Sequence, residues 1–245
     1  MSHELTPDGV DLVVRNVEGW FGGHEGRLLY RLAARADPNG CIVEIGSWQG
    51  RSTIWLAAGA RSGRGATVVA VDPHRGTDLR RDGEDTEPLL RANLDAAGVA
   101  EGVEIVVATS EEAEREWTRP VSFLWIDGDH SYEGALLDLE RWEPHLTADA
   151  AVAFHDTFVW PGPERVFRER IVRSHRYTRF EWAETTSAAR RCGRLSRPEG
   201  LRRRADLARR ALYGARLRAY DRNTLGFARI RDVFARAGRD GHLGT

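Results

Sequence analysis

The 245-residue sequence has no lysine, and all 36 of its basic residues are arginine. We attribute this bias to the base composition of the gene and not to function. Only two cysteines are present, which argues against a disulfide framework and predicts reduced thiols in a cytoplasm. No run approaches the roughly 20 apolar residues of a membrane-spanning helix. The N-terminus has neither the basic start nor the apolar core of a signal peptide, so we expect a cytoplasmic protein without a membrane partner.

The composition is otherwise that of an ordinary globular protein, with 41% hydrophobic residues, 30% charged residues and a formal net charge of −1. This length and composition suit one α/β domain with a full core. The charge is uneven, because residues 190–239 contain sixteen arginines and only four acidic residues. We therefore predict a main domain over residues 1–196 and an Arg-rich, helical extension over residues 197–245.

Short apolar runs alternate with helical periodicities along the main domain, and this alternation predicts a Rossmann-like, doubly wound, mostly parallel sheet of seven strands. A polar loop, expected to be mobile, covers residues 74–85. The predicted strands are 41–45, 67–71, 103–107, 121–126 and 150–154, with an edge hairpin at 177–182 and about 188–192. The predicted helices are 9–19, 25–35, 52–60, 87–97, a helix capped by Thr109, 132–142 and 163–174.

The chain is organised around residues 41–57, where a buried strand, a glycine turn and a helix follow one another. Such a unit is typical of a nucleotide-type ligand site, because the free N–H groups of the first helical turn face the ligand. The G-x-G-x-x-G fingerprint of dinucleotide sites is missing. Instead, Glu44-x-Gly46-x-x-x-Gly50 resembles motif I of the class I S-adenosylmethionine (SAM) methyltransferases. An acid at Glu44 suits a ligand that carries an ammonium beside its carboxylate. The candidate cofactor-binding residues in this stretch are Glu44, Gly46, Ser47, Gly50 and Ser52.

Other polar residues follow the remaining strands, and in open α/β sheets ligands bind beyond the carboxyl ends of the strands. Asp72 ends the second strand, where a carboxylate can accept the hydroxyls of a ribose, in SAM or NAD alike. Ser110, after the third strand, is placed near the adenine by its position alone. Asp127, after the fourth strand, is expected to border the cofactor as well as to serve a second purpose.

That second purpose is a metal site. Asp127 and the pair His155-Asp156 end neighbouring strands, so their side chains could converge within ligand distance of one ion. Oxygen ligands with room for water suit Mg²⁺, and a histidine nitrogen would admit Mn²⁺ or Fe²⁺. His130 could lie beside the ion and accept a proton from a substrate hydroxyl, with Asp129 as the next candidate base.

Residues 25–170 resemble metal-dependent small-molecule O-methyltransferases, both the catechol type and, more closely, those that methylate sugar hydroxyls in macrolides and related natural products. The resemblance implies that Asp127-x-x-His130 contributes a metal ligand, Asp127, and a general base, His130. It implies a further ligand at Asp156. The related enzymes have an acid where this chain has His155, so the third ligand departs from their pattern.

We therefore predict a SAM-dependent O-methyltransferase that acts on a small hydroxylated acceptor, a sugar or glycosylated natural product, with a divalent metal that we expect to be Mg²⁺. The alternatives are an RNA methyltransferase that uses the Arg-rich tail, an NAD-dependent oxidoreductase, and a non-enzymatic SAM-fold binding subunit. The leucines of the tail form an apolar strip, and we expect the tail to pack against the body or across a homodimer interface. A nucleic-acid partner is not expected. The leucines concerned are Leu201, Leu207, Leu212 and Leu217.

Overall fold

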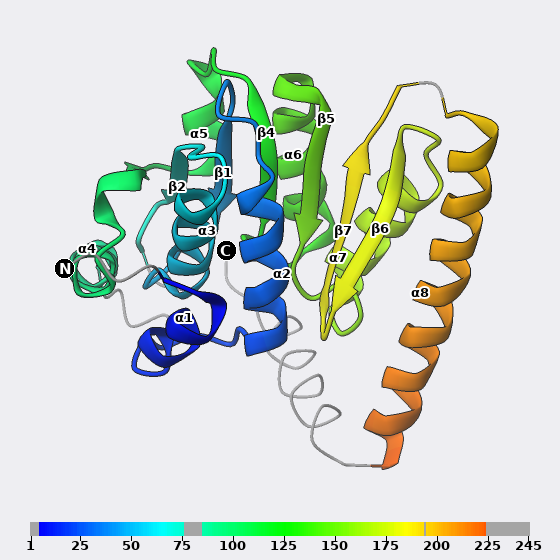
Figure 1. The fold of residues 1–245 in the computed structure, drawn as a ribbon, viewed down its shortest axis with the longest axis horizontal. Coiled ribbons are helices and arrows are strands. Elements are labelled where there is room, and N and C mark those ends of the chain that lie inside the picture. The colour runs from blue at the N-terminus through cyan, green and yellow to red at the C-terminus, as the bar shows by residue number, and fades with distance from the viewer. Residues whose placement is uncertain (1–4, 76–84, 194, 224–245) are drawn as a thin grey trace, which may run out of the picture.

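A seven-stranded sheet forms the centre of the computed structural model, which describes residues 5–75, 85–193 and 195–223 (Figure 1). Five neighbouring strands are parallel, whereas β7 is antiparallel to both of its neighbours. The predicted doubly wound, mostly parallel sheet is therefore confirmed. In order across the sheet, the strands are β3 (Val103–Val107), β2 (Val68–Asp72), β1 (Cys41–Ile45), β4 (Val121–Ile126), β5 (Leu146–Phe154), β7 (Thr186–Arg191) and β6 (Tyr177–Ala183).

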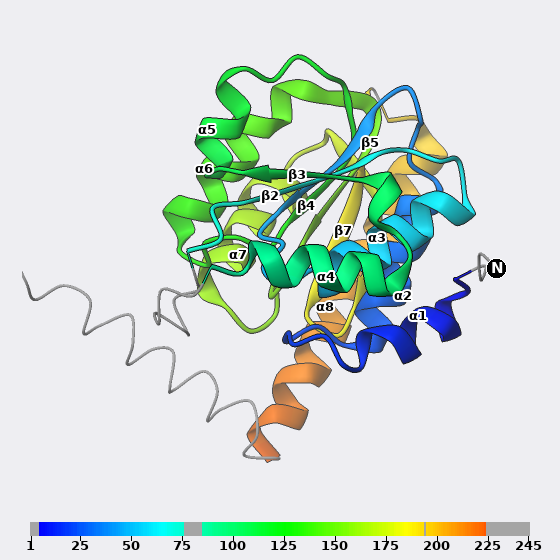
Figure 2. The same cartoon turned by 90° about the vertical axis from the view of Figure 1, so that its left-hand side faces the viewer.

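Helices cover both faces of this sheet (Figure 2). One face packs against α1 (Pro7–Val14), α2 (Gly23–Ala34), α3 (Arg51–Ser62) and α4 (Glu87–Ala97). The other face packs against α5 (Ser110–Arg115), α6 (Tyr132–Trp142), α7 (Pro161–Val166) and the π-helical turn η3 (Phe167–Val172). The short 3₁₀ turns η1 (Ala100–Gly102) and η2 (Glu143–His145) lead into β3 and β5.

Alternate residues of the central strands face opposite helical layers, which explains why these strands are almost continuously apolar. Ile42 and Trp125 lie in the core beneath α2 and α3, whereas Val43 and Leu124 lie in the core beneath α6 and α7. A parallel strand that is buried on both faces needs apolar side chains at nearly every position.

The register of the strands decides which residues meet where the parallel strands end. Ile45 of β1 is paired with Ile126 of β4, which in turn is paired with Phe154 of β5. The residues that follow, Gly46, Asp127 and His155, are therefore brought side by side at one edge. In Figure 1 this edge lies at the bottom of the sheet, near α1.

Several elements differ from the expected boundaries by one or two residues, and α1 and β5 differ by more. Helix α1 ends at Val14 and not at residue 19, because the chain turns so that Val17 is buried in the core. Strand β5 begins at Leu146 and not at residue 150, because Leu146 already pairs with Val121. Strand β7 begins at Thr186 instead of about 188. Most of the predicted loop at 74–85 lies outside the described residues.

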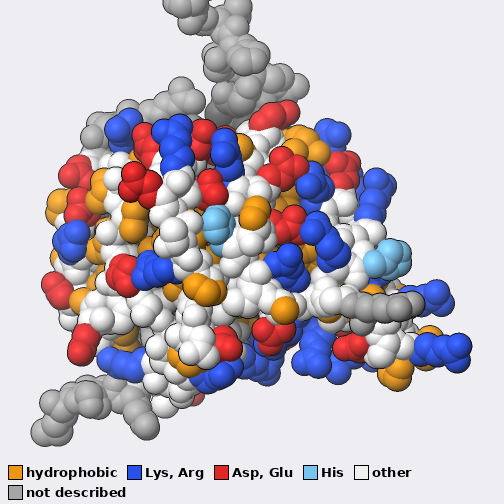
Figure 3. Space-filling model, turned by 90° about the horizontal axis from the view of Figure 1, so that it is seen from above, with side chains coloured by type: hydrophobic (Ala, Val, Ile, Leu, Met, Phe, Trp, Pro, Cys, Tyr) orange, Lys and Arg blue, Asp and Glu red, His pale blue; other side chains and the backbone are white. Residues whose placement is uncertain are grey.

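The start of the Arg-rich extension forms helix α8 (Arg197–Asn223), which packs against β6. Arg203 and Asp206 provide buried contacts and Leu207 touches the core, but Leu201 and Leu212 are 67% and 55% exposed. The described part of the tail thus packs against the body, one of the two predicted arrangements, and polar residues as well as Leu207 make this contact. Within the described residues, none of the helices combines the length and apolar character needed to cross a bilayer. Acidic and basic side chains are interspersed over the end of the molecule seen in Figure 3.

Candidate active site

The turn between β1 and α3 depends on two glycines. Gly46 has a φ of +86°, and a Cβ there would overlap the carbonyl oxygen of Asp127. Gly50 has a φ of +89°, and a Cβ there would lie 2.5 Å from Leu90 Cδ1. Positive φ angles are readily adopted only by glycine, so both positions satisfy a backbone requirement as well as a steric one. The resulting turn holds β1 close to the end of β4.

Glu44 ties β1 to the first turn of α3. Its Oε1 accepts a hydrogen bond from Ser52 Oγ and its Oε2 accepts one from Thr53 Oγ1, both at 2.5 Å. The side chain is 0% exposed, and this burial raises the pKa of Glu44 to about 8. The hydroxyl of Ser52, a predicted cofactor contact, is thus engaged with Glu44. A contact between Glu44 and a ligand ammonium stays a prediction.

Two further features of the turn fit a bound SAM. The Ser47 hydroxyl is buried, yet it has no hydrogen-bond partner among the residues that the structure describes. Asp72 accepts the N–H of Trp48 at 2.8 Å and the N–H of His74 at 2.7 Å, so it joins the end of β2 to the glycine turn. An unpaired buried hydroxyl beside a glycine cradle is the arrangement expected where a polar ligand completes the site. Ser110, in contrast, accepts a hydrogen bond from Trp142 Nε1.

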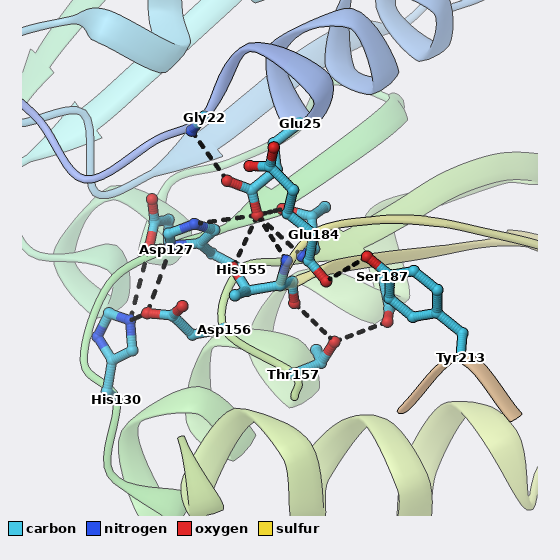
Figure 4. A network of polar contacts seen from close by, with 12 residues as sticks. Gly22, Glu25, Asp127, His130, His155, Asp156, Thr157, Glu184, Ser187 and Tyr213 are labelled. Carbon is cyan, nitrogen blue, oxygen red and sulfur yellow. Dashed lines mark hydrogen bonds and ion pairs between the residues drawn. The ribbon is translucent and has the colours of Figure 1, made fainter. Parts of the chain in front are cut away.

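Four ionisable side chains meet where β4 and β5 end (Figure 4). His155 Nδ1 lies 3.1 Å from Asp127 Oδ1 and 3.5 Å from Asp156 Oδ2. His130 Nε2 lies 3.0 Å from Asp156 Oδ2 and 3.7 Å from Asp127 Oδ1. Each imidazole therefore contacts both carboxylates. The predicted convergence of these strand ends is seen in the structure, while the roles of the residues stay predictions.

The carboxylates and imidazoles of this cluster stabilise each other's charged forms. Burial acts to lower the pKa of His155, but the carboxylates of Asp127 and Asp156 raise that pKa well above its ordinary value. Burial acts to raise the pKa of Asp156, but the charge of His155 and the hydrogen bond from His130 hold it below its ordinary value. For His130, burial is likewise outweighed by Asp156 and Asp127, and its pKa is raised.

The donor atoms of this cluster fit a divalent metal. One ligand atom from each of Asp127, His130 and His155 lies within 4.8 Å of the other two, and Asp156 contacts both imidazoles. The group that meets this distance is Asp127, His130 and His155, and the role of Asp156 as a ligand stays a prediction. Carboxylate and imidazole donors in one site admit Mn²⁺ or Fe²⁺ as well as Mg²⁺.

Asp129 does not join this cluster, which corrects its assignment as the next candidate base. Its two carboxylate oxygens accept hydrogen bonds from the N–H of Ser131 at 2.7 Å and from the Ser131 hydroxyl at 2.9 Å. Asp129 is exposed and stabilises the turn into α6. A short acid followed by serine at the start of a helix commonly makes such local hydrogen bonds.

Glu25, which no sequence pattern marked as a site residue, lies directly behind His155. Its Oε1 is 3.5 Å from His155 Nε2, and its Oε2 accepts the N–H of Gly22 at 3.0 Å. Burial acts to raise the pKa of Glu25, but the nearby His155 keeps it below the ordinary value. The spacing Gly22-x-x-Glu25 at a helix start was the available signal, since it predicts a capping interaction.

Aromatic side chains surround the cluster. The rings of Phe21 and Trp125 lie 5.7 Å and 5.8 Å from the ring of His155, and the ring of Trp160 lies 5.1 Å from that of His130. Trp20 stacks on Trp48 of the glycine turn at 4.9 Å. Phe21 and Trp125 are buried beside His155, whereas Trp20 is 57% exposed.

Known proteins share both this sequence region and this fold. Residues 43–157, which include the end of β1, the glycine turn and all four clustered residues, match the Methyltransf_24 family, described as a methyltransferase domain. The O-methyltransferase NovP is 17% identical, with a TM-score of 0.60 over 73% of this chain and 84% of its own. An O-methyltransferase from Bacillus cereus in complex with S-adenosylhomocysteine (SAH) is 20% identical, with a TM-score of 0.54 over 74% and 90%.

A third structure is the O-methyltransferase TomG from Streptomyces achromogenes, involved in tomaymycin synthesis and solved in complex with SAM. It is 19% identical, with a TM-score of 0.56 over 76% of this chain and 89% of its own. At these identities the likeness establishes the shared fold. The family match adds that residues 43–157 are similar to a methyltransferase domain, which favours a methyltransferase over an NAD-dependent oxidoreductase. The match over residues 43–157 and the shared fold together support a SAM-dependent methyltransferase.

Proposed function

We propose that this methyltransferase transfers the methyl group of SAM to a hydroxyl of a small molecule, either a sugar or a glycosylated natural product. The observation that carries the proposal is the meeting of Asp127, His130, His155 and Asp156 beside the turn at Gly46. An oxygen nucleophile must lose its proton to attack a methyl group, and this cluster combines a candidate base with metal ligands. The names of NovP and TomG, both O-methyltransferases, agree with this choice.

Asp127, His155 and Asp156 would hold the divalent metal in the proposed site. When bound, such a metal lowers the pKa of a coordinated hydroxyl and stabilises the alkoxide. The imidazole of His155 shifts the expected preference from Mg²⁺ towards Mn²⁺ or Fe²⁺, because nitrogen donors suit transition metals. Asp127 and Asp156 would orient the acceptor oxygen indirectly, because they would fix the position of the ion.

His130 would act as the general base. Its side chain is 28% exposed, whereas that of His155 is 6% exposed, so His130 is the histidine that an acceptor can reach. Asp156 contacts Nε2 and the ring of Trp160 lies beside the imidazole, so that both fix the ring orientation. Removal of a positioned general base typically lowers turnover by roughly 10²–10⁴-fold.

The proposal is tested by methyl transfer from labelled SAM to a panel of sugars and glycosides, with RNA as the alternative acceptor. We expect His130→Ala to lose roughly 10²–10⁴-fold in turnover with SAH affinity unchanged, as for a lost base. The matched control is His145→Ala, since His145 also pairs with a carboxylate, Glu114 at 2.8 Å, but lies outside the cluster.

Each part of the proposal can fail separately. Full activity after exhaustive chelation would remove the metal, and normal turnover of His130→Ala would place the base elsewhere. Methylation of RNA but of none of the small acceptors would refute the proposed substrate class.

A further inference from the structure

Glu25 is a buried carboxylate that the proposed reaction does not use. It comes from α2, more than 100 residues before His155 in the chain, and is 2% exposed. Burying a carboxylate is costly unless it is paired and hydrogen-bonded, so its presence here requires an explanation. Figure 4 shows its carboxylate on the side of the His155 ring that faces away from His130.

Glu25 is held in one position by hydrogen bonds from two parts of the chain. Oε2 accepts the N–H of Gly22 at the start of α2. Oε1 accepts the N–H of Thr185 at 3.0 Å, the Thr185 hydroxyl at 2.7 Å, and the N–H and hydroxyl of Thr186, both at 3.0 Å. Thr185 lies in the turn between β6 and β7, and Thr186 is the first residue of β7. The carboxylate therefore cannot rotate away from His155 without losing several partners at once.

The two nitrogens of His155 face opposite environments. Nε2 faces Glu25 Oε1 at 3.5 Å, and Nδ1 faces Asp127 Oδ1 at 3.1 Å and Asp156 Oδ2 at 3.5 Å. The ring is packed against Phe21 and Trp125, which restricts rotation about its side-chain bonds. Only one nitrogen can therefore serve the cluster, and the other is directed at a fixed negative charge.

We propose that Glu25 is a positioning residue for the metal centre: it accepts the Nε2–H of His155, which directs the Nδ1 lone pair towards an ion shared with Asp127 and Asp156. The inference rests on the metal site of the proposed function. Histidines that bind metals commonly donate their second N–H to a carboxylate, which fixes the tautomer and makes the imidazole a stronger ligand. The loss of such a partner typically weakens metal binding by roughly 10–100-fold.

Glu25→Gln in the full chain provides the test, since glutamine keeps an oxygen for the two threonines and removes the negative charge. Binding of Mn²⁺ and Co²⁺ is measured by calorimetry, and bound Co²⁺ is followed by its visible absorption bands. We expect roughly 10–100-fold weaker metal binding, altered Co²⁺ bands and unchanged SAH affinity. Glu114→Gln is the matched control, because it removes the carboxylate of the separate His145–Glu114 pair. It should bind both metals as the unsubstituted protein does.

The possible results distinguish the existence of the metal centre from the positioning role of Glu25. Unsubstituted protein that binds neither metal would overturn the metal centre and the role of Glu25 with it. Normal affinity and unaltered Co²⁺ bands in Glu25→Gln would overturn the positioning role alone. Should Glu25→Gln fail to fold, Thr185→Val removes one hydroxyl donor to Oε1 and leaves the charge in place. A smaller loss of metal affinity in that variant supports the role of Glu25, and unchanged affinity refutes it.

Discussion

Glu44 should make the protein less stable at alkaline pH, and Glu44→Gln should remove much of this effect. The carboxyl is completely buried, and burial raises its pKa from the ordinary 4.5 to about 8. The folded state therefore keeps a proton that the unfolded chain releases between these two values. The contribution of the protonated Glu44 carboxyl to the free energy of unfolding is complete below pH 4.5. It is lost as the pH rises through about 8.

The size of the effect follows from the difference between the two pKa values. At about 1.4 kcal/mol per pKa unit, the free energy of unfolding should fall by about 5 kcal/mol across the whole range. Between about pH 6 and about pH 8.5 the loss should be about 2.5 kcal/mol. The glutamine of the Glu44→Gln variant cannot ionise, and the hydroxyls of Ser52 and Thr53 can still bond to its amide, so this part of the pH dependence should vanish.

Urea denaturation of both proteins at the two pH values measures this difference. Relative to the unsubstituted protein, the free energy of unfolding of Glu44→Gln should rise by about 2.5 kcal/mol from the lower to the higher pH. An equal difference in stability at both pH values would show that Glu44 is already ionised in the folded protein, and the reasoning would then fail. Thr53→Val, which removes the donor to Oε2, should retain the pH dependence and extend it to higher pH.

Two further variants test the cofactor turn and α8. Asp72→Ala should weaken SAH binding by roughly 1–3 kcal/mol in a calorimetric titration, because the N–H groups of Trp48 and His74 lose their acceptor. Unchanged affinity would exclude Asp72 from the site. Arg203→Ala should lower the free energy of unfolding by about 2–3 kcal/mol, because the guanidinium donates to the carbonyls of Tyr177 and Ser174. Exposed Arg204→Ala is its control, and equal stability of the two variants would contradict the packing role.

The secondary structure could be predicted where local patterns and burial agree. Strands β1, β3 and β4 and helices α4 and α6 have the predicted bounds, because apolar runs or helical periodicity end at recognisable residues such as Gly98. The end of α1 was predicted less well. There the need to bury Val17 overrides a local helical pattern, and that need arises from the packed core.

The sequence by itself determined that Asp127, His155 and Asp156 would meet. Parallel strands that end at the same edge bring their following residues together, and the register of β1, β4 and β5 does this here. The sequence could not show that Asp129 turns away, because the choice between a local hydrogen bond and the cluster depends on side-chain geometry.

Only the tertiary structure placed Glu25 behind His155. Its position depends on α2 packing over the end of β5 and on the turn between β6 and β7, elements separated by well over 100 residues of chain. Local propensity acts over a few residues, and so it marks Glu25 merely as an acid in the first turn of a helix. The physical reason for its burial is a set of hydrogen bonds and one charge that exist only once the sheet and both helical layers have assembled.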